Sequence, residues 1–184
     1  LAETCEAILD DFWSVEERLF HDTARDAEAL IVRPRNALDT ATPSGNSLAA
    51  ECLWRAGRLL DEEPWRQVAR RVVLREADTV REHPSAYGRL LCVADRILAD
   101  PLEIAIVGKR DHPELRALHR AAMAPFLPDL VLTGREEGEA LPRPVPVLDG
   151  RHEVEGRPAA YVCRSYTCRA PVTTPDELRD EIAS

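Results

Sequence analysis

The sequence lacks the features that would place it in a membrane or on nucleic acid. No apolar run approaches the roughly 20 residues that span a bilayer, and Glu3 and Glu6 interrupt the apolar character that a signal peptide needs. The net charge is -9 at pH 7, with a pI near 5.1. A general nucleic-acid binder needs a basic face instead. We therefore expect no membrane partner and no nucleic-acid partner.

Short motifs for metals, nucleotides and nucleophilic catalysis are also missing. The five histidines have no metal-binding spacing such as HExxH, and no Gly-x-Ser-x-Gly elbow supplies a nucleophile. The sequence accordingly predicts no metal site and no cofactor. It also has no initiator methionine and opens inside a helical pattern, so we interpret it as a fragment of a longer protein.

The cysteines do not form an obvious disulfide framework, because there are five of them and they are scattered. Three lie on apolar helix faces, which is typical of buried free thiols and favours a reducing, cytoplasmic compartment. Cys163 and Cys168 are five positions apart, which on one continuous strand would put their sulfurs on opposite faces. Two structural thiols are the favoured interpretation; a disulfide or thiol-exchange pair requires residues 165–167 to turn back.

Residues 1–99 have the pattern of a helical domain. Apolar residues recur at helical spacing over 1–13, from about Asn46 to Leu60, and in two further stretches that end at His83-Pro84 and before Pro101. The short connections between the last three helices predict antiparallel neighbours. The residues expected to face the core include Ala49, Cys52, Leu53, Ala56, Leu60, Leu90, Leu91, Ile97 and Leu98.

Residues 100–184 change to a small α/β pattern. A β-rich run at 103–108, a helix capped by Asp111 and marked by Phe126, and a second run at 129–134 predict a βαβ unit with parallel strands. Residues 145–148 are a candidate edge segment, residues 159–163 a third strand, and Thr174 a capping-box start for a last helix. The fold class is thus mainly α with a small α/β part.

Gly108-Lys109-Arg110-Asp111 stands between a strand and a helix, where α/β folds bind phosphate. The glycine is single, however, and Asp111 puts negative charge where an anion would lie. A capped turn is the favoured interpretation, with nucleotide binding as the alternative.

The Pro-Ser-Gly-Asn-Ser run at 43–47 carries more polar groups than one helix cap needs. It follows a long connection, residues 14–43, without sustained periodicity, and such connections are often functional. Polar and charged residues accumulate there, including His21 and Asp26. On residue types alone, a solvated loop followed by a capped helix is favoured over a ligand site.

A resemblance to a known family is carried by three stretches: FHDTARDAEALIVRPRNALDTATPSGNSLAAECLWRAGRL, IAIVG and AAYVCRSYTCRAPVTTPDEL. Together they resemble the C-terminal region of the thioredoxin-domain proteins related to spermatogenesis-associated protein 20. That resemblance implies an upstream thioredoxin-like domain as a partner, and an (α/α)6 toroid similar to six-hairpin glycosidases. This chain would hold the last helical hairpins of the toroid and a βαβ-type appendage. The thioredoxin motif is absent here, so no redox centre carries over.

The resemblance places residues 14–43 and the 43–47 run at the central cleft of the toroid. One hypothesis is therefore a site for a carbohydrate-like ligand, with acid–base chemistry open to His21, Asp22 and Asp39. Its candidate residues are Asp22, Arg33, Arg35, Asp39, Asn46 and Ser47. The alternative is a non-enzymatic scaffold or protein-interaction module that supports the thioredoxin domain. A piece of a toroid leaves apolar helix faces uncovered, which predicts self-association.

Overall fold

The computed structural model describes residues 1–28, 32–164 and 167–184. It contains two compact units, Leu1–Leu98 and Ala99–Ser184, each with its own hydrophobic core. The described residues form six α-helices and a small mixed four-stranded sheet, so the expected mixture of α and α/β parts is present. No toroid is evident in the part of the chain that is described.

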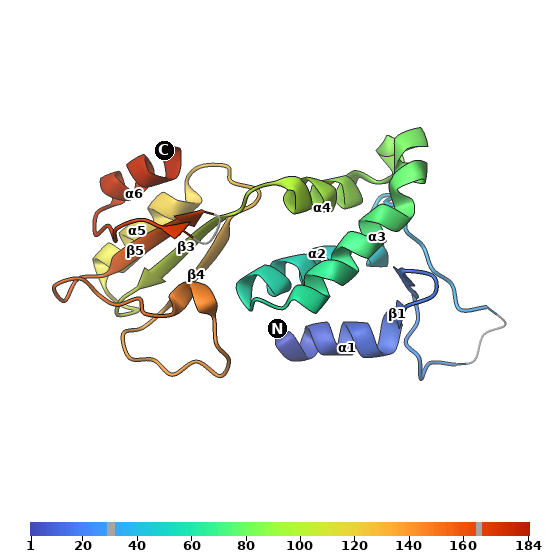
Figure 1. Cartoon of the computed structure of the whole chain (residues 1–184), viewed down its shortest axis with the longest axis horizontal. Coiled ribbons are helices and arrows are strands. Elements are labelled where there is room, and N and C mark those ends of the chain that lie inside the picture. Colours follow the sequence, from blue (N-terminus) through green and yellow to red (C-terminus); the bar gives the residue numbers. More distant parts are fainter. Residues whose placement is uncertain (29–31, 165–166) are drawn as a thin grey trace. The chain divides into compact units, whose positions relative to one another are not determined.

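The first unit is a set of helices with one short hairpin (Figure 1). Its elements are α1 (Ala2–Phe12), β1 (Trp13–Ser14), β2 (Leu19–Phe20), α2 (Gly45–Leu59), α3 (Glu63–Glu82), η1 (Pro84–Ala86) and α4 (Gly88–Leu98). Helix α2 packs on α1, α3 and α4, and its Leu53 and Ala50 are fully buried at the centre. The long connection from 14 to 43 therefore begins as an antiparallel β1–β2 hairpin, which the sequence pattern did not predict.

The buried face of α2 includes Leu53 and Ala56, as expected, but it also includes polar residues that were not expected there. Ala49 and Cys52 are only half-buried, whereas Asn46, Ser47 and Glu51 are buried. These three polar side chains can be buried because they find hydrogen-bond or ionic partners inside the unit, which offsets their loss of hydration. On α4, Leu90 faces the core as expected, and Val93, which the pattern did not single out, is buried as well. Leu91 and Leu98 were expected in the core but are exposed, the latter by 86%.

The second unit is a sheet covered on both faces (Figure 1). Its elements are β3 (Leu102–Val107), α5 (Pro113–Met123), β4 (Val131–Arg135), η2 (Pro146–Leu148), β5 (Ala159–Arg164), β6 (Thr167–Cys168) and α6 (Pro175–Ala183). The strand order is β4-β3-β5-β6. Strands β3 and β4 are parallel, which confirms the predicted βαβ unit, and β5 joins the other side of β3 antiparallel.

Alternate residues of β3 serve two different cores. Ile104 and Ile106 pack with α5 and α6, while Ala105 and Val107 pack with Leu148 of η2 on the opposite face. Burial on both faces explains why this strand is a continuous apolar run. The strand β4 approaches closely at Gly134, where a Cβ atom would lie 2.6 Å from the carbonyl oxygen of Ile106.

Several local expectations in the second unit are wrong. Residues 146–148 form a 3₁₀ helix whose Leu148 enters the core, and not an edge strand. His112 caps α5, since its Nδ1 accepts from the Glu114 backbone N–H at 3.2 Å, in place of Asp111. Phe126 lies beyond the end of α5 and is 92% exposed. The capping box at Thr174 and Glu177 is confirmed.

The favoured expectation of two free thiols at Cys163 and Cys168 is also wrong, because the two residues form a disulfide. The argument from opposite faces assumed one continuous strand. Strands β5 and β6 instead pair antiparallel, and their register places Cys163 directly opposite Cys168. Residues 165–166, in the stretch that was expected to turn back, lie outside the described residues. Cys5, Cys52 and Cys92 remain free thiols.

Candidate functional site

The 43–47 run opens α2 by side-chain capping. Ser44 is the N-cap, and its hydroxyl oxygen accepts from the backbone N–H of Ser47 at 3.1 Å. The same hydroxyl donates to the hydroxyl of Ser47 at 2.9 Å. Both serines are buried. Their polar groups therefore satisfy the first turn of the helix, which would otherwise leave N–H groups without partners.

Asn46 connects the start of α2 to the hairpin. Its side-chain oxygen accepts from the backbone N–H of Phe20 at 2.6 Å, and its amide nitrogen donates to the Phe20 carbonyl at 2.9 Å. The amide nitrogen also donates to the carbonyl of Asn36 at 3.1 Å. Asn46 is 1% exposed. Its carboxamide thus holds β2 and the end of the long connection in place and leaves no edge for a ligand.

The carboxylate of Asp39 accepts hydrogen bonds from the N-terminal ends of two helices, α2 and α4. One carboxylate oxygen accepts from the Ser44 backbone N–H at 2.8 Å. The other accepts from the N–H groups of Arg89 and Leu90, at 2.8 and 3.1 Å, in the first turn of α4. Burial raises the pKa of Asp39, but the hydrogen bonds from Ser44, Leu90, Ser47 and Arg89 outweigh burial, and the net pKa is lowered. Asp39 is therefore a charged cap and not a proton donor near neutral pH.

The remaining candidates lie in the connection before α2. Arg33 donates to the carbonyls of Asp11 and Thr23, at 3.2 and 2.6 Å, and Arg35 pairs with Glu17 at 3.2 Å. Asp22 is exposed and accepts from the Asn36 backbone N–H at 3.2 Å. Asp39 and Ser47 thus both hydrogen-bond to Ser44, and Asn46 bonds to the backbone of Phe20 and Asn36. The two arginines are held elsewhere, Arg33 by backbone carbonyls and Arg35 by Glu17.

A cavity of about 550 Å³ lies beside this cluster, between α1, β2 and α2. It is lined by Ile8, Phe12, Phe20, His21, Asp22, Gly45, Leu48, Ala49 and Cys52. Of the six candidate residues, Asp22 alone lines it. The ring nitrogen Nδ1 of His21 is buried without a hydrogen-bond partner. His21 and Asp22 are therefore the polar groups that this cavity offers to a ligand, beside the rings of Phe12 and Phe20.

Glu51 is a functional candidate that the sequence did not reveal. Its carboxylate is buried on α2 and pairs with Arg55 at 3.4 Å, Arg96 at 3.7 Å and Arg89. A glutamate in the second turn of a helix gives no sign of burial by itself, and the arginines of α4 are far away in sequence. The cluster ties α2 to α4, and a buried carboxylate of this kind needs such partners to offset desolvation.

The second unit has a smaller cavity of about 370 Å³ at the ends of β3 and β4. Arg110, His119, Glu136 and Glu139 contribute polar groups to it. Glu136 accepts from the backbone N–H of Arg110 at 2.8 Å, so a carboxylate already occupies the position where a phosphate would bind. This arrangement favours the capped-turn interpretation over a nucleotide site.

Among residues 1–28, 32–164 and 167–184, no helix is long and apolar enough to cross a membrane. Within the same described residues, no cluster of three or more His, Cys, Asp or Glu side chains is placed to hold a metal ion.

The fold and the candidate site define a two-unit, mixed α/β protein in which Ser44, Asn46 and Ser47 bond to backbone groups and to one another. Comparison with known proteins adds a distant relationship. The chain is 26% identical to spermatogenesis-associated protein 20 of Homo sapiens over 152 residues, which are 82% of this chain and 19% of that protein. It is 25% identical to the Rattus norvegicus protein of the same name over 176 residues, 90% of this chain and 22% of that protein.

The chain therefore spans about a fifth of the length of the curated relatives that it matches. The similarity concerns part of spermatogenesis-associated protein 20. No protein-family model matches the chain, and no solved structure matches it.

Proposed function

We propose that the first unit of this chain, Leu1–Leu98, is a non-enzymatic scaffold, a protein-interaction module within a longer cytoplasmic protein related to spermatogenesis-associated protein 20. One observation carries the proposal: Ser44, Asn46, Ser47 and Asp39 direct their polar atoms to backbone groups and to one another. A catalytic or sugar-binding cluster would keep such groups free to bind a ligand. The partner is the upstream thioredoxin-like domain or the other helices of the toroid.

A surface suited to such a partner lies on α4. Leu91 and Leu98 are seven positions apart, hence on one side of the helix, and both are exposed. Leu90 and Val93 on another side are buried in the core. A helix that is apolar on two sides is suited to pack between two layers, as helices of an (α/α)6 toroid do. Further helices of the longer protein would cover this second side.

The test is self-association of the 184-residue chain, measured by light scattering over a concentration series. We expect association that increases with concentration, because Leu91 and Leu98 are uncovered. The double variant Leu91→Asp and Leu98→Asp should be monomeric, whereas Val15→Asp, at an exposed apolar position away from α4, should associate like the wild type. A wild-type chain that stays monomeric at high concentration would contradict the proposal.

A carbohydrate-like ligand is the second candidate, favoured by the cavity of about 550 Å³ whose lining includes His21 and Asp22. Here His21 and Asp22 would bind hydroxyl groups, and Phe12 and Phe20 would contact a sugar face. Titration calorimetry with a panel of sugars would detect saturable binding. His21→Ala and Asp22→Asn should each abolish that binding, and Arg35→Met should leave it unchanged. If no sugar binds, the scaffold proposal alone stands.

A further inference from the structure

The disulfide of the second unit joins two cysteines in unequal environments. Cys163 lies on β5 beside the centre of the sheet and is 1% exposed. Cys168 lies on β6, which is an edge strand of only two residues, and it is partly exposed. A reactant from solution can therefore reach the sulfur of Cys168 more easily than the sulfur of Cys163. Such asymmetry between the two sulfurs is required of a pair that exchanges disulfides in a defined order.

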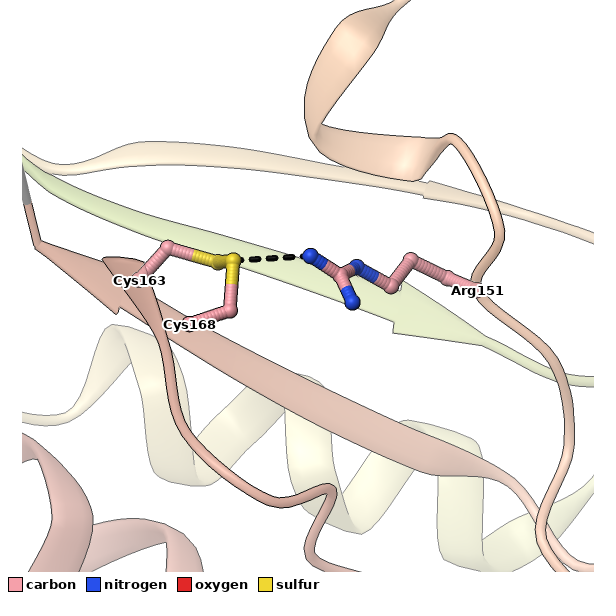
Figure 2. Close-up of a disulfide and its surroundings, with 3 residues drawn as sticks. All are labelled: Arg151, Cys163 and Cys168. Carbon is pink, nitrogen blue, oxygen red and sulfur yellow. Dashed lines mark hydrogen bonds between the residues drawn. A yellow bond between two sulfur atoms is a disulfide. The ribbon is translucent and has the colours of Figure 1, made fainter. Parts of the chain in front are cut away.

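A guanidinium group contacts the more exposed sulfur. Figure 2 shows the side chain of Arg151 directed at the disulfide, and its Nη2 atom lies 2.7 Å from the Sγ atom of Cys168. A neighbouring arginine stabilises a thiolate relative to a thiol, because the positive charge attracts the negative sulfur. When the disulfide is reduced, Arg151 is thus placed to keep Cys168 in its reactive, deprotonated form.

Arg151 is held in this position by several contacts. Its guanidinium carbon lies 4.9 Å from the ring centroid of Tyr161, a cation–π contact on β5. Its carbonyl accepts from Arg135 at 3.0 Å. The next residue, His152, accepts from the Tyr161 hydroxyl through its carbonyl at 2.9 Å. The charge beside Cys168 is therefore built into the unit and does not depend on a freely rotating surface side chain.

The other charges around the pair allow the same chemistry. Glu103 on β3 is opposite Cys163 in the antiparallel ladder, and it is buried. Directly opposite residues have side chains on one face of the sheet, with Cβ atoms about 5 Å apart. The side chain of Glu103 therefore lies on the same face of the sheet as that of Cys163. Arg164 and Arg169, which flank the pair, donate to the Ile182 carbonyl and to Glu181 respectively.

From these contacts we propose that Cys163 and Cys168 form a thiol–disulfide exchange site, with Cys168 as the nucleophile and Cys163 as the resolving thiol. In the reduced protein the Cys168 thiolate attacks a substrate disulfide. A bond forms from Cys168 to one substrate sulfur, and the other substrate sulfur leaves as a thiolate and is protonated. Cys163 then attacks Cys168, and its proton passes to the second substrate sulfur as that sulfur leaves. This step releases the second substrate thiol and restores the disulfide of the structure, so two protein thiols are oxidised and one substrate disulfide is reduced.

The first test traps the intermediate in the full chain. The Cys163→Ser variant, reduced and then mixed with oxidised glutathione, should acquire glutathione at Cys168, located by peptide mass spectrometry. Mapping separates this adduct from any at Cys92, the exposed free thiol. The Cys168→Ser variant should give no adduct at Cys163 on the same time scale. A Cys163→Ser chain that leaves Cys168 unmodified, or equal reactivity of the two cysteines, would overturn the proposal.

The second test isolates the role of Arg151. Arg151→Met should slow adduct formation at pH 7 about threefold to tenfold, since less thiolate is present and the remaining thiolate is only somewhat more nucleophilic. Arg151→Lys keeps the charge and should retain most of the rate. Circular dichroism confirms that each variant is folded. An unchanged rate in Arg151→Met would show that the disulfide is merely structural.

Two further measurements keep the proposal testable. If Cys163→Ser fails to fold, the reduced wild type should be alkylated by iodoacetamide at Cys168 before Cys163, and the reverse order counts against the proposal. Comparing oxidised glutathione with insulin as substrates distinguishes small disulfides from protein disulfides. Faster reaction with insulin would identify a protein substrate, faster reaction with glutathione a small one, and no reaction with either would refute the exchange activity.

Discussion

At the scale of single residues, Asn46 determines how the first unit is assembled. A carboxamide that pairs with both backbone groups of Phe20 acts like an added strand residue, although it lies on a helix. The capping role of Ser44 could be predicted from local residue types. The role of Asn46 could not, because its partner is 26 residues away in the chain and residue types do not specify which distant backbone group an amide will meet.

Replacing Asn46 should therefore destabilise the first unit strongly. Asn46→Ala leaves the buried N–H and carbonyl of Phe20 without partners, and we expect a loss of about 3 kcal/mol in the free energy of unfolding. The matched control is Gly45→Ala, since a Cβ atom at Gly45 meets nothing within 4 Å. That variant should be neutral or slightly more stable, because it restricts the unfolded chain. Urea unfolding measures both, and equal stabilities would contradict the role given to Asn46.

Asp39 should make the unfolding free energy of the first unit depend on pH in the acid range. Its folded pKa is lowered from 3.8, so its stabilisation is complete above the unfolded pKa and is lost as pH falls through the folded pKa. The Asp39→Asn variant lacks this titration. The difference in unfolding free energy between wild type and variant should be constant near neutral pH and should shrink below pH 3.8. A difference that stays constant into strong acid would show that Asp39 is not a charged cap.

At the scale of elements, the helices and the βαβ unit could be predicted because periodicity and capping are local properties of the sequence. The burial of polar residues on α2 and the β5–β6 hairpin could not. The first depends on the partners of Glu51 and Asn46, and the second on the antiparallel pairing that places Cys168 opposite Cys163. The prediction of the candidate site was limited for the same reason. Asp22 lines the cavity as a candidate residue, but the apolar wall of the cavity comes from α1 and arises only through tertiary packing.

The capping box of α6 offers a test at this scale. The Thr174 hydroxyl accepts from the N–H of Glu177 at 3.3 Å, and losing such a cap costs about 1 kcal/mol. We expect Thr174→Ala to lower the midpoint temperature at which the second unit unfolds, measured by circular dichroism. Thr173→Ala removes a hydroxyl of the same type next to the cap and should have a much smaller effect. Similar losses in both variants would show that the cap is not the cause.

At the scale of the whole molecule, each of the two units has a hydrophobic core of its own. All three tryptophans, Trp13, Trp54 and Trp65, belong to the first unit. The disulfide belongs to the second. Tryptophan fluorescence therefore reports unfolding of one unit, while reduction of the disulfide acts on the other.

Removing the disulfide should separate the two unfolding transitions. The double variant Cys163→Ser and Cys168→Ser loses a short cross-link, which is worth about 2 kcal/mol for a loop of this size. When urea unfolding is monitored by circular dichroism, we expect the part of the signal that comes from the second unit to change at a lower urea concentration. The midpoint seen by tryptophan fluorescence should not move. Equal shifts in both signals would show that the two units unfold as one.

The close approach of the parallel strands at Gly134 has a consequence for how this sequence can evolve. Even an alanine there would bring its Cβ atom to 2.6 Å from the Ile106 carbonyl oxygen, which is backbone and cannot rotate away. In a library that samples every residue at each position, selection for folded protein should retain glycine at 134 and accept many residues at 45. A glycine at the position of Gly134 is thus a marker by which more distant sequences with this strand pairing can be recognised.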